Sequence, residues 1–186
     1  ELQLAKVIQQ GIIPKDTPAE FISSLYKPIE KVGGDFYDFI SFRDSEKIGI
    51  FFSDVSGHGI PAAFITSMLK TIILQSGTRR KNPKELLEYL NEVLFGQTSG
   101  NFITVFYGIY DPAKRTLYYS NAGHPQPFII GRDIYQLKER KQTAIAMFSN
   151  ETLLEKNKLF TNHTLELPIG TKLLLFTDGL TEAKSI

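Results

Sequence analysis

Two apolar stretches of the chain each lead to an aspartate beside a glycine turn. Residues 47–55 are apolar apart from the first lysine, two small residues and Asp54, and residues 173–176 are uninterruptedly apolar ahead of Asp178. Short apolar runs bounded by turn residues are typical of buried strands. We therefore predict strands over 47–55 and 172–176 that deliver Asp54 and Asp178 to the ends of a sheet.

The segment after Asp54 predicts a tight turn and then a long helix. Gly57 and Gly59 allow unusual backbone angles, and Pro61 suits the start of a helix, where its missing N–H costs nothing. The apolar face of this helix, predicted over 61–75, consists of Ile65, Met68, Leu69, Ile72 and Ile73. A carboxylate beside backbone groups that no ladder uses suits a metal ion or a phosphate. The alternative is an aspartate that only caps the turn.

Two further helices are predicted, one after residue 82 and one at the start of the chain. Asn82 is a suitable cap, and Glu85 stands three residues after it, as in a capping box. Residues 1–14 carry apolar residues at helical spacing until Pro14 ends the pattern. Because the chain begins inside this pattern without methionine, we expect the helix to enter from an upstream polypeptide. A simple packing helix is the alternative.

A hairpin is predicted ahead of the first helix of the core. Residues 20–29 favour one strand, and a glycine pair then leads into a partly alternating aromatic run that begins at Asp35. If the strand from Asp35 pairs with 47–55 as a hairpin, the start of one strand is level with the end of the other. Asp35 and Asp54 would then be neighbours.

The second half of the chain favours further strands. They are predicted over 102–110, 116–120, 127–131, 160–167 and 172–176, with a turn over 111–115. Residues 139–158 are polar and irregular and predict no element. Strand pairs with two adjacent helices indicate an α/β (α+β) domain of mainly antiparallel sheets covered by helices.

Composition narrows the possible functions. The net charge of +1 among 186 residues favours neither nucleic acid nor an acidic membrane surface as a partner, and we expect a solvated loop at the short basic run 79–81. The chain has no cysteine, which excludes disulfides and thiol nucleophiles and is compatible with a reducing, cytoplasmic compartment. No apolar run approaches the roughly 18 residues that span a bilayer.

The three aspartates share one context, the edge of a strand beside glycine. Two unit charges about 5 Å apart repel by roughly 3 kcal/mol at an effective dielectric near 20, so convergence of Asp35, Asp54 and Asp178 would need cations. With three histidines and no cysteine, the available ligands are hard oxygens, which favour Mg²⁺ or Mn²⁺ over zinc. Two such ions activate water and clamp a phosphoryl group. The predicted chemistry is metal-assisted phosphoester hydrolysis.

Four motifs lie in order along nearly the whole chain. They are Val32-Gly33-Gly34-Asp35-Phe36-Tyr37-Asp38, Asp54-Val55-Ser56-Gly57-His58-Gly59, Asn121-Ala122-Gly123-His124-Pro125 and Thr177-Asp178-Gly179-Leu180-Thr181-Glu182-Ala183. Together they resemble the motifs of the SpoIIE-type (RsbU-like) bacterial members of the metal-dependent protein serine/threonine phosphatases, the PPM superfamily.

The resemblance implies a central antiparallel β-sandwich flanked by helices, with two Mn²⁺ or Mg²⁺ ions at one edge. It implies that Asp54 bridges both ions, that the backbone carbonyl of Val55 helps to hold one, and that Asp35 and Asp178 bind the other. The glycines implied to support these ligands are Gly34, Gly57, Gly59 and Gly179.

The resemblance also implies a substrate, partners and a domain organisation. The substrate would be a phosphoserine or phosphothreonine protein, typically an anti-sigma-factor antagonist with a STAS domain. Residues 1–14 would be the end of a helix that joins an upstream sensor domain to a catalytic domain over 15–186, with a homodimer through that helix. The protein would be cytoplasmic, or tethered through an upstream membrane sensor.

Two departures from the family pattern concern whole segments. The family ends with a further aspartate in an Asp-Asp-x-Thr block and a last strand, and this chain stops at Ile186 before that block. We therefore expect one ligand of the metal held by Asp35 and Asp178, and one strand, to be absent from this sequence. The family's Pro-Leu-Gly block is not recognisable in 142–150, so a substrate-facing loop is expected to differ there.

A third departure concerns the proton donor. Eukaryotic relatives carry a candidate general-acid histidine at the position of Ser56, whereas here His58 follows two residues later. His58 is a candidate proton donor, and a turn histidine bonded to the backbone is the alternative. We expect His124 to be structural and Lys31 to be solvated, with a phosphate contact as the alternative for Lys31.

The sequence leaves two other functional hypotheses open. The motif Gly33-Gly34-Asp35-Phe36 has some likeness to the diguanylate cyclase loop, but residue 36 is not acidic and a cyclase explains neither Asp54 nor Asp178. A catalytically silent phosphatase fold that binds a protein partner is the second hypothesis, and the absent final aspartate favours it.

Overall fold

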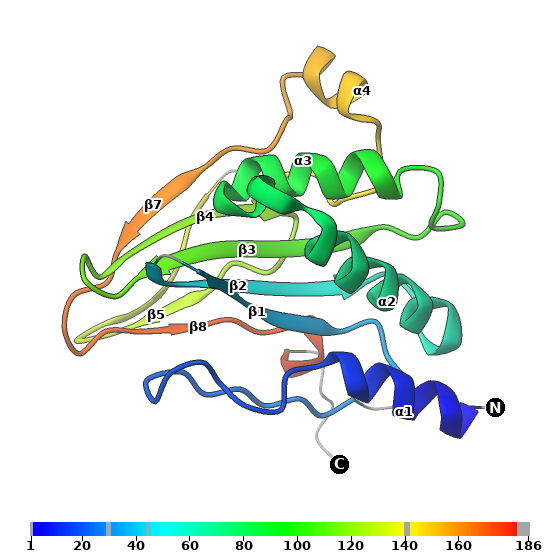
Figure 1. Cartoon of the computed structure of the whole chain (residues 1–186). Helices are drawn as coiled ribbons and strands as arrows, with labels where there is room; N and C mark the ends of the chain where they lie inside the picture. The colour runs from blue at the N-terminus through cyan, green and yellow to red at the C-terminus, as the bar shows by residue number, and fades with distance from the viewer. Residues whose placement is uncertain (1, 29–30, 44, 140–141, 182–186) are drawn as a thin grey trace.

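The computed structural model describes residues 2–28, 31–43, 45–139 and 142–181. Figure 1 shows two antiparallel sheets with helices packed against them. The helices are α1 (Leu2–Ile12), α2 (Gly59–Gln75), α3 (Pro83–Leu94) and α4 (Asn150–Glu155), with 3-10 helices η1 (Gly77–Lys81) and η2 (Asp178–Leu180). The strands are β1 (Phe36–Phe42), β2 (Ser45–Val55), β3 (Ile103–Asp111), β4 (Thr116–Ala122), β5 (Phe128–Ile130), β6 (Ile134–Gln136), β7 (His163–Glu166) and β8 (Lys172–Leu174).

Two of the four strand pairs of the larger sheet, β1–β2 and β3–β4, are hairpins. Its strand order is β1-β2-β3-β4-β7, and each neighbouring pair is antiparallel. In the β1–β2 hairpin, Phe36 pairs with Ser53. This register brings the start of β1 level with the end of β2, which confirms the predicted hairpin.

The smaller sheet joins segments that are far apart in the sequence. Its order is β6-β5-β8, so β8 pairs with β5 and brings the C-terminal part of the described chain beside residues 128–130. A small apolar cluster lies between the two sheets: Phe106, Leu117 and Tyr119 from the larger sheet pack with Leu173 and Leu175. The two sheets therefore form the predicted antiparallel sandwich.

Helices α2 and α3 lie across the other face of the larger sheet (Figure 1). Their buried apolar residues, Leu69 and Leu90 among them, pack against Phe51, Val105 and Tyr107 in the main core. The predicted cap of α3 is confirmed, because Asn82 accepts from the Glu85 N–H and donates to the Glu85 carboxylate. None of the helices in the described ranges has the length and apolar character required to cross a bilayer.

The strand predicted over 20–29 is wrong for the described part of that range. Residues 22–28 have no regular secondary structure, and the side chain of Leu25 is 88% exposed. Side-chain hydrogen bonds hold this segment in place of a ladder: the Tyr37 hydroxyl donates to Ser24 Oγ (3.2 Å), and the Tyr26 hydroxyl donates to the Asp35 carbonyl (3.3 Å). Strand propensity without a partner strand was not sufficient to form a strand.

Several element boundaries also differ from the sequence-based expectation. Helix α2 begins at Gly59, which places Pro61 inside its first turn, and residues 79–81 lie in η1 and not in a loop. Strand β8 ends at Leu174, two residues earlier than predicted. Within the range predicted to have no element, α4 forms because the Ser149 hydroxyl accepts from the Thr152 N–H (3.2 Å) and caps it.

Candidate metal-binding site

The first two predicted ligands lie at adjacent strand ends. Asp35 directly precedes β1, Asp54 is the penultimate residue of β2, and the Val55 N–H donates to the Gly34 carbonyl (3.2 Å). A Cβ added to Gly34 would stand 2.5 Å from the Val55 carbonyl oxygen and 3.3 Å from Asp54 Oδ1. Only glycine fits at residue 34, so Gly34 lets the backbone before Asp35 lie directly against the end of β2.

The turn that follows Asp54 is attached to the loop before β3. The Ser56 N–H donates to the Phe102 carbonyl (2.9 Å), and Ser56 Oγ accepts from the Phe102 N–H (2.8 Å). Gly57 and Gly59 have φ angles of +99° and +74°, which confirms the unusual backbone predicted for this turn. These two hydrogen bonds fix the end of β2, which carries Asp54 and the Val55 carbonyl.

His58 occupies the N-cap position of α2. Its backbone is extended, its side chain is exposed, and that side chain does not hydrogen-bond the first N–H groups of the helix. The structure therefore places His58 at the surface of the turn that carries Asp54. Its role as a proton donor stays a prediction.

The third predicted ligand reaches the site from the C-terminal part of the chain. Asp178 begins η2 and is exposed, and the preceding Thr177 donates its hydroxyl to Asp35 Oδ2 (3.0 Å). This hydrogen bond joins two segments that sequence reasoning could bring together only through the family resemblance. Thr177 itself was missed as a site residue, although it opens the fourth motif.

The electrostatics of Asp35 favour occupation by a cation. Burial raises the pKa of the Asp35 carboxyl, the hydrogen bond from Thr177 lowers it, and the nearby negative charge of Asp178 raises it again. A cation beside this pair would stabilise both ionised carboxylates and oppose the effect of burial. The pair therefore has the charge that a hard divalent ion requires.

The described residues only partly assemble the predicted ligand set. Among residues 2–28, 31–43, 45–139 and 142–181, no three acidic, histidine or cysteine side chains converge closely enough to hold a metal ion. Asp35 and Asp178 form one pair, and Asp54 with the Val55 carbonyl forms a second donor group across the β1–β2 hairpin. All of these donors are hard oxygens, and the close approach of Gly34 to the end of β2 brings the two groups to one edge of the larger sheet. The residues therefore fit Mg²⁺ or Mn²⁺.

The histidine of the third motif is inside the molecule. His124 is 3% exposed, and its two ring nitrogens contact Thr104 Oγ1 (2.9 Å) and the Phe176 carbonyl oxygen (3.1 Å). Burial lowers its pKa to about 4, against the opposing effect of the Phe176 carbonyl. The structural role predicted for His124 agrees with this position. Lys31, by contrast, is exposed, as expected for a solvated lysine.

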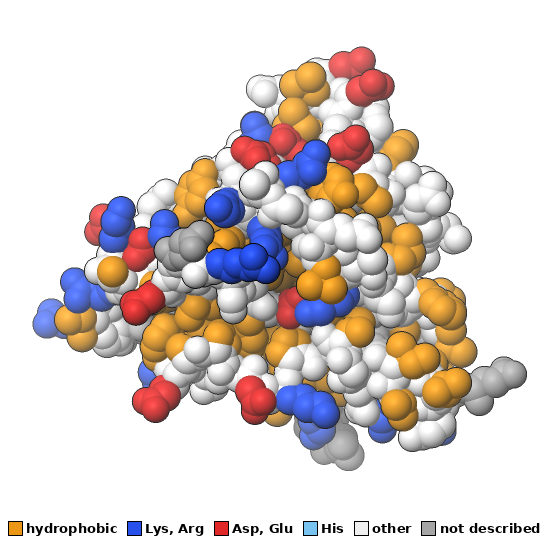
Figure 2. Space-filling model, viewed as in Figure 1, with side chains coloured by type: hydrophobic (Ala, Val, Ile, Leu, Met, Phe, Trp, Pro, Cys, Tyr) orange, Lys and Arg blue, Asp and Glu red, His pale blue; other side chains and the backbone are white. Residues whose placement is uncertain are grey.

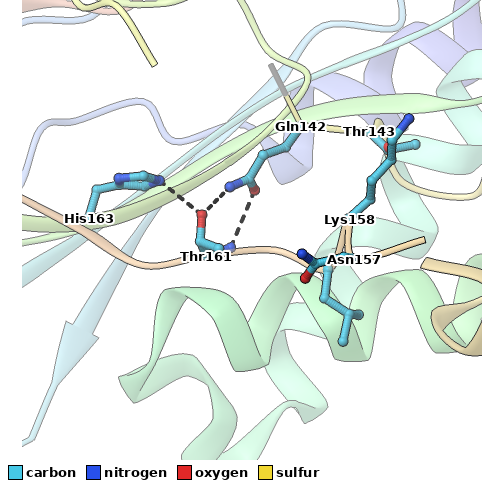
Figure 3. A pocket seen from close by; sticks show the side chains of 7 residues that line it. Gln142, Thr143, Asn157, Lys158, Thr161 and His163 are labelled. Atoms are coloured by element: carbon cyan, nitrogen blue, oxygen red, sulfur yellow. Dashed lines mark hydrogen bonds between the residues drawn. The ribbon is translucent and has the colours of Figure 1, made fainter. Parts of the chain in front are cut away.

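A separate hollow of about 170 Å³ lies beside β7 (Figure 3). Gln142, Lys158 and His163 are among its lining side chains, and Thr161 Oγ1 lies 3.0 Å from His163 Nε2. Among the described residues that line it there is no predicted site residue and no carboxylate. We therefore place the candidate site at the edge defined by the three aspartates and not in this hollow.

The fold is that of a PP2C-type domain. The SiaA-PP2C domain of Pseudomonas aeruginosa matches with a TM-score of 0.76 at 25% identity, over 96% of this chain and 70% of that one. The model of the family Stage II sporulation protein E (SpoIIE) matches residues 44–186, and the chain belongs to this family. The matched range contains Asp54 and Asp178, whereas Asp35 precedes it.

Two relatives from Bacillus subtilis (strain 168) have similar sequences. Phosphoserine phosphatase RsbU is 29% identical over 189 residues, which cover 100% of this chain and 54% of the relative. Phosphoserine phosphatase RsbP is 30% identical over 189 residues, which cover 97% of this chain and 45% of the relative. The chain thus spans about half the length of these curated relatives.

Proposed function

We propose that the chain is the catalytic domain of a metal-dependent protein serine/threonine phosphatase. The observation that carries this proposal is the meeting of Asp35 and Asp178, from opposite ends of the chain, beside the β2 end that holds Asp54. Membership of the SpoIIE family and two relatives named phosphoserine phosphatase support the same reaction.

In this proposal Asp54 and the Val55 carbonyl would hold one Mn²⁺ or Mg²⁺ ion, and Asp35, Asp178 and Asp54 would hold a second. Bound ions of this kind activate water and stabilise charge on a transferring phosphoryl group. The residues of the chain place the ligands. Gly34 lets the β1–β2 hairpin close at its end, and Thr177 orients the Asp35 carboxylate by its hydrogen bond. His58, exposed on the adjacent turn, is proposed to give a proton to the leaving serine or threonine oxygen.

The substrate is proposed to be a phosphoserine or phosphothreonine on a regulatory protein, of the STAS-domain type that antagonises an anti-sigma factor. Asp178 and His58 are both exposed, so the site opens at the surface of the domain. A phosphorylated side chain that projects from a folded partner can reach such a site without entering a deep cavity. The net charge of +1 gives no reason to expect nucleic acid as a partner.

Helix α1 is proposed to connect the catalytic domain, over 15–186, to an upstream sensor and to a second copy. Leu4 is 64% exposed, Val7 and Ile8 on the same helix are also exposed, and Phe64 of the adjacent α2 is 67% exposed. Figure 2 shows hydrophobic side chains gathered over this part of the molecule. An apolar surface of this kind suits helix–helix contact with another polypeptide.

The second candidate function is a silent phosphatase fold that binds a regulatory protein. The absence of a three-ligand group among the described residues favours it. The test is the release of phosphate from a phosphoserine protein by the full chain as encoded, with and without Mn²⁺. We expect Asp54→Asn to abolish release and the exposed Asp133→Asn to leave it unchanged. Binding of the phosphoprotein without phosphate release in Mn²⁺ would establish the silent fold.

A further inference from the structure

The ring of His124 connects the two sheets of the sandwich. On one side it meets Thr104 of β3 and packs edge-on against Phe52 of β2, with ring centroids 5.4 Å apart. On the other side it reaches the carbonyl of Phe176, just after β8 of the smaller sheet. A single side chain therefore contacts both layers of the fold close to the candidate metal site.

The backbone that carries this ring is held by the rest of its motif. The Asn121 side chain accepts from the His124 N–H (2.8 Å) and donates to the His124 carbonyl (3.1 Å). Gly123 has a φ of +73°, and a Cβ there would stand 3.2 Å from the Ala144 nitrogen. The two hydrogen bonds from Asn121 and the close approach of Gly123 to Ala144 hold the turn in place, so the orientation of the His124 ring is defined.

The partners of the ring determine its tautomer. A carbonyl oxygen only accepts, so the contact with Phe176 requires a proton on Nε2. The neutral ring then has no proton on Nδ1, and the Thr104 hydroxyl donates to that nitrogen. His124 is thus an acceptor toward the larger sheet and a donor toward the smaller sheet.

The two hydrogen bonds of the His124 ring, to Thr104 and to the Phe176 carbonyl, form a bridge between the sheets. Each end of this bridge lies next to a predicted metal ligand. Thr104 is the residue that pairs with Asp54 across the β2–β3 ladder. Phe176 immediately precedes Thr177, whose hydroxyl holds Asp35 Oδ2, and Asp178 follows. The bridge therefore runs between the strand that carries Asp54 and the segment that carries Asp178.

We propose that His124 is a positioning residue of the metal site. Its donation to the Phe176 carbonyl holds the 176–178 segment at a fixed distance from the end of β2, so that Asp178 and Asp35 face Asp54. This inference rests on the proposed metal-dependent function, and it assigns to the third motif a role that the ligand set does not include.

Two conservative substitutions separate positioning from core filling. In His124→Gln the side-chain amide nitrogen takes the place of Nε2 and retains a donor for Phe176. In His124→Asn the shorter amide stays beside Thr104 and does not reach Phe176. The control is Tyr107→Phe on β3, three residues from Thr104, which removes a buried donation to the Arg80 carbonyl (2.6 Å).

The measurements are the Mn²⁺ dissociation constant, from electron paramagnetic resonance of free Mn²⁺, and the melting temperature without metal. We expect His124→Asn to weaken Mn²⁺ binding by about tenfold, the lower end of the effect of losing an outer-shell partner, because His124 bonds to neighbours of the predicted ligands and not to the ligands. We expect His124→Gln to keep the affinity within about threefold. Tyr107→Phe should lower the melting temperature and leave the affinity unchanged. Thr104→Val, with Thr104→Ser as its control, tests the other end of the bridge if His124→Asn does not fold.

The outcomes distinguish this inference from the proposed function. If the unaltered protein binds Mn²⁺ and the Asn and Gln variants bind it equally well, the positioning role is wrong while the metal site stands. Tyr107→Phe shows how much Mn²⁺ affinity is lost when the melting temperature falls without any change near the site. If both His124 variants lose no more affinity than this for the same fall in melting temperature, His124 is a core residue. If the unaltered protein binds no Mn²⁺, the metal proposal is overturned, and the positioning role with it.

Discussion

Gly34→Ala is the sharpest perturbation of the candidate site that leaves every predicted ligand in place. The added methyl would stand 2.5 Å from the Val55 carbonyl oxygen and 3.3 Å from Asp54 Oδ1. The first of these atoms belongs to the backbone of β2, so relief requires the hairpin end to open. Overpacking of this kind costs about 1–3 kcal/mol in the free energy of unfolding. For a chain of this size that corresponds to a fall of roughly 2–12 °C in melting temperature.

The neighbouring Gly33→Ala is a matched control. A Cβ at Gly33 meets nothing nearer than Pro28 Cβ at 3.9 Å, and its hydrogen bonds with Gln9 use backbone atoms that alanine retains. Alanine also restricts the unfolded chain, so this variant should be neutral or slightly stabilised.

The assay combines urea unfolding with Mn²⁺ titration of both variants. We expect only Gly34→Ala to lose stability, and we expect its Mn²⁺ affinity to fall because Asp54 moves with the strand end. Equal stability and equal affinity in the two variants would show that the close approach at Gly34 has no part in the site.

Three other results are expected. Gln9→Leu should cost about 1–3 kcal/mol, because it leaves the Gly33 N–H and carbonyl without their partner (3.0 and 2.6 Å), whereas exposed Gln10→Leu should cost little in the same urea titration. Lys70→Met should cost about 3 kcal/mol at pH 7 by leaving buried Asp38 unpaired. Burial raises the pKa of Asp38 and Lys70 lowers it, so removal of Lys70 raises this pKa further, and the loss should shrink as pH falls through the pKa that Asp38 has in the variant. Millimolar Mn²⁺ should raise the melting temperature of the unaltered protein and not that of the Asp54→Asn variant.

The parts of the fold that follow from local pattern were predictable from the sequence. The β1–β2 hairpin follows from an apolar run that pairs with an aromatic run, and α3 follows from the cap at Asn82. Helix α4 was not predictable in the same way, because its six residues are too few for a clear period and only the Ser149 cap marks them. The failed strand at residues 20–28 had the right composition but no neighbouring strand to pair with.

The polar contacts of the site were less accessible to sequence reasoning. Gln9 stands four residues after Ala5 and three before Ile12, on the inward face of α1, and its polar side chain is buried against Thr66 and Gly33. Thr177 could have been suspected from its place beside Asp178, but its partner Asp35 is revealed only by the tertiary structure. The local pattern of residues does not show which distant polar groups meet in the fold.

The three predicted ligands depend on progressively more distant contacts. Asp54 and the Val55 carbonyl are set by one strand and its turn, and Asp35 is added by the β1–β2 hairpin. Asp178 joins only when β8 pairs with β5, a contact that the stacked rings of Phe128 and Phe176 reinforce with centroids 5.5 Å apart. Docking of β8 brings the exposed Asp178 near the partly buried Asp35, and the repulsion between the two carboxylates opposes docking, an effect that a bound cation would offset. Metal binding and attachment of the C-terminal strand should therefore be coupled, each stabilising the other by the same free energy.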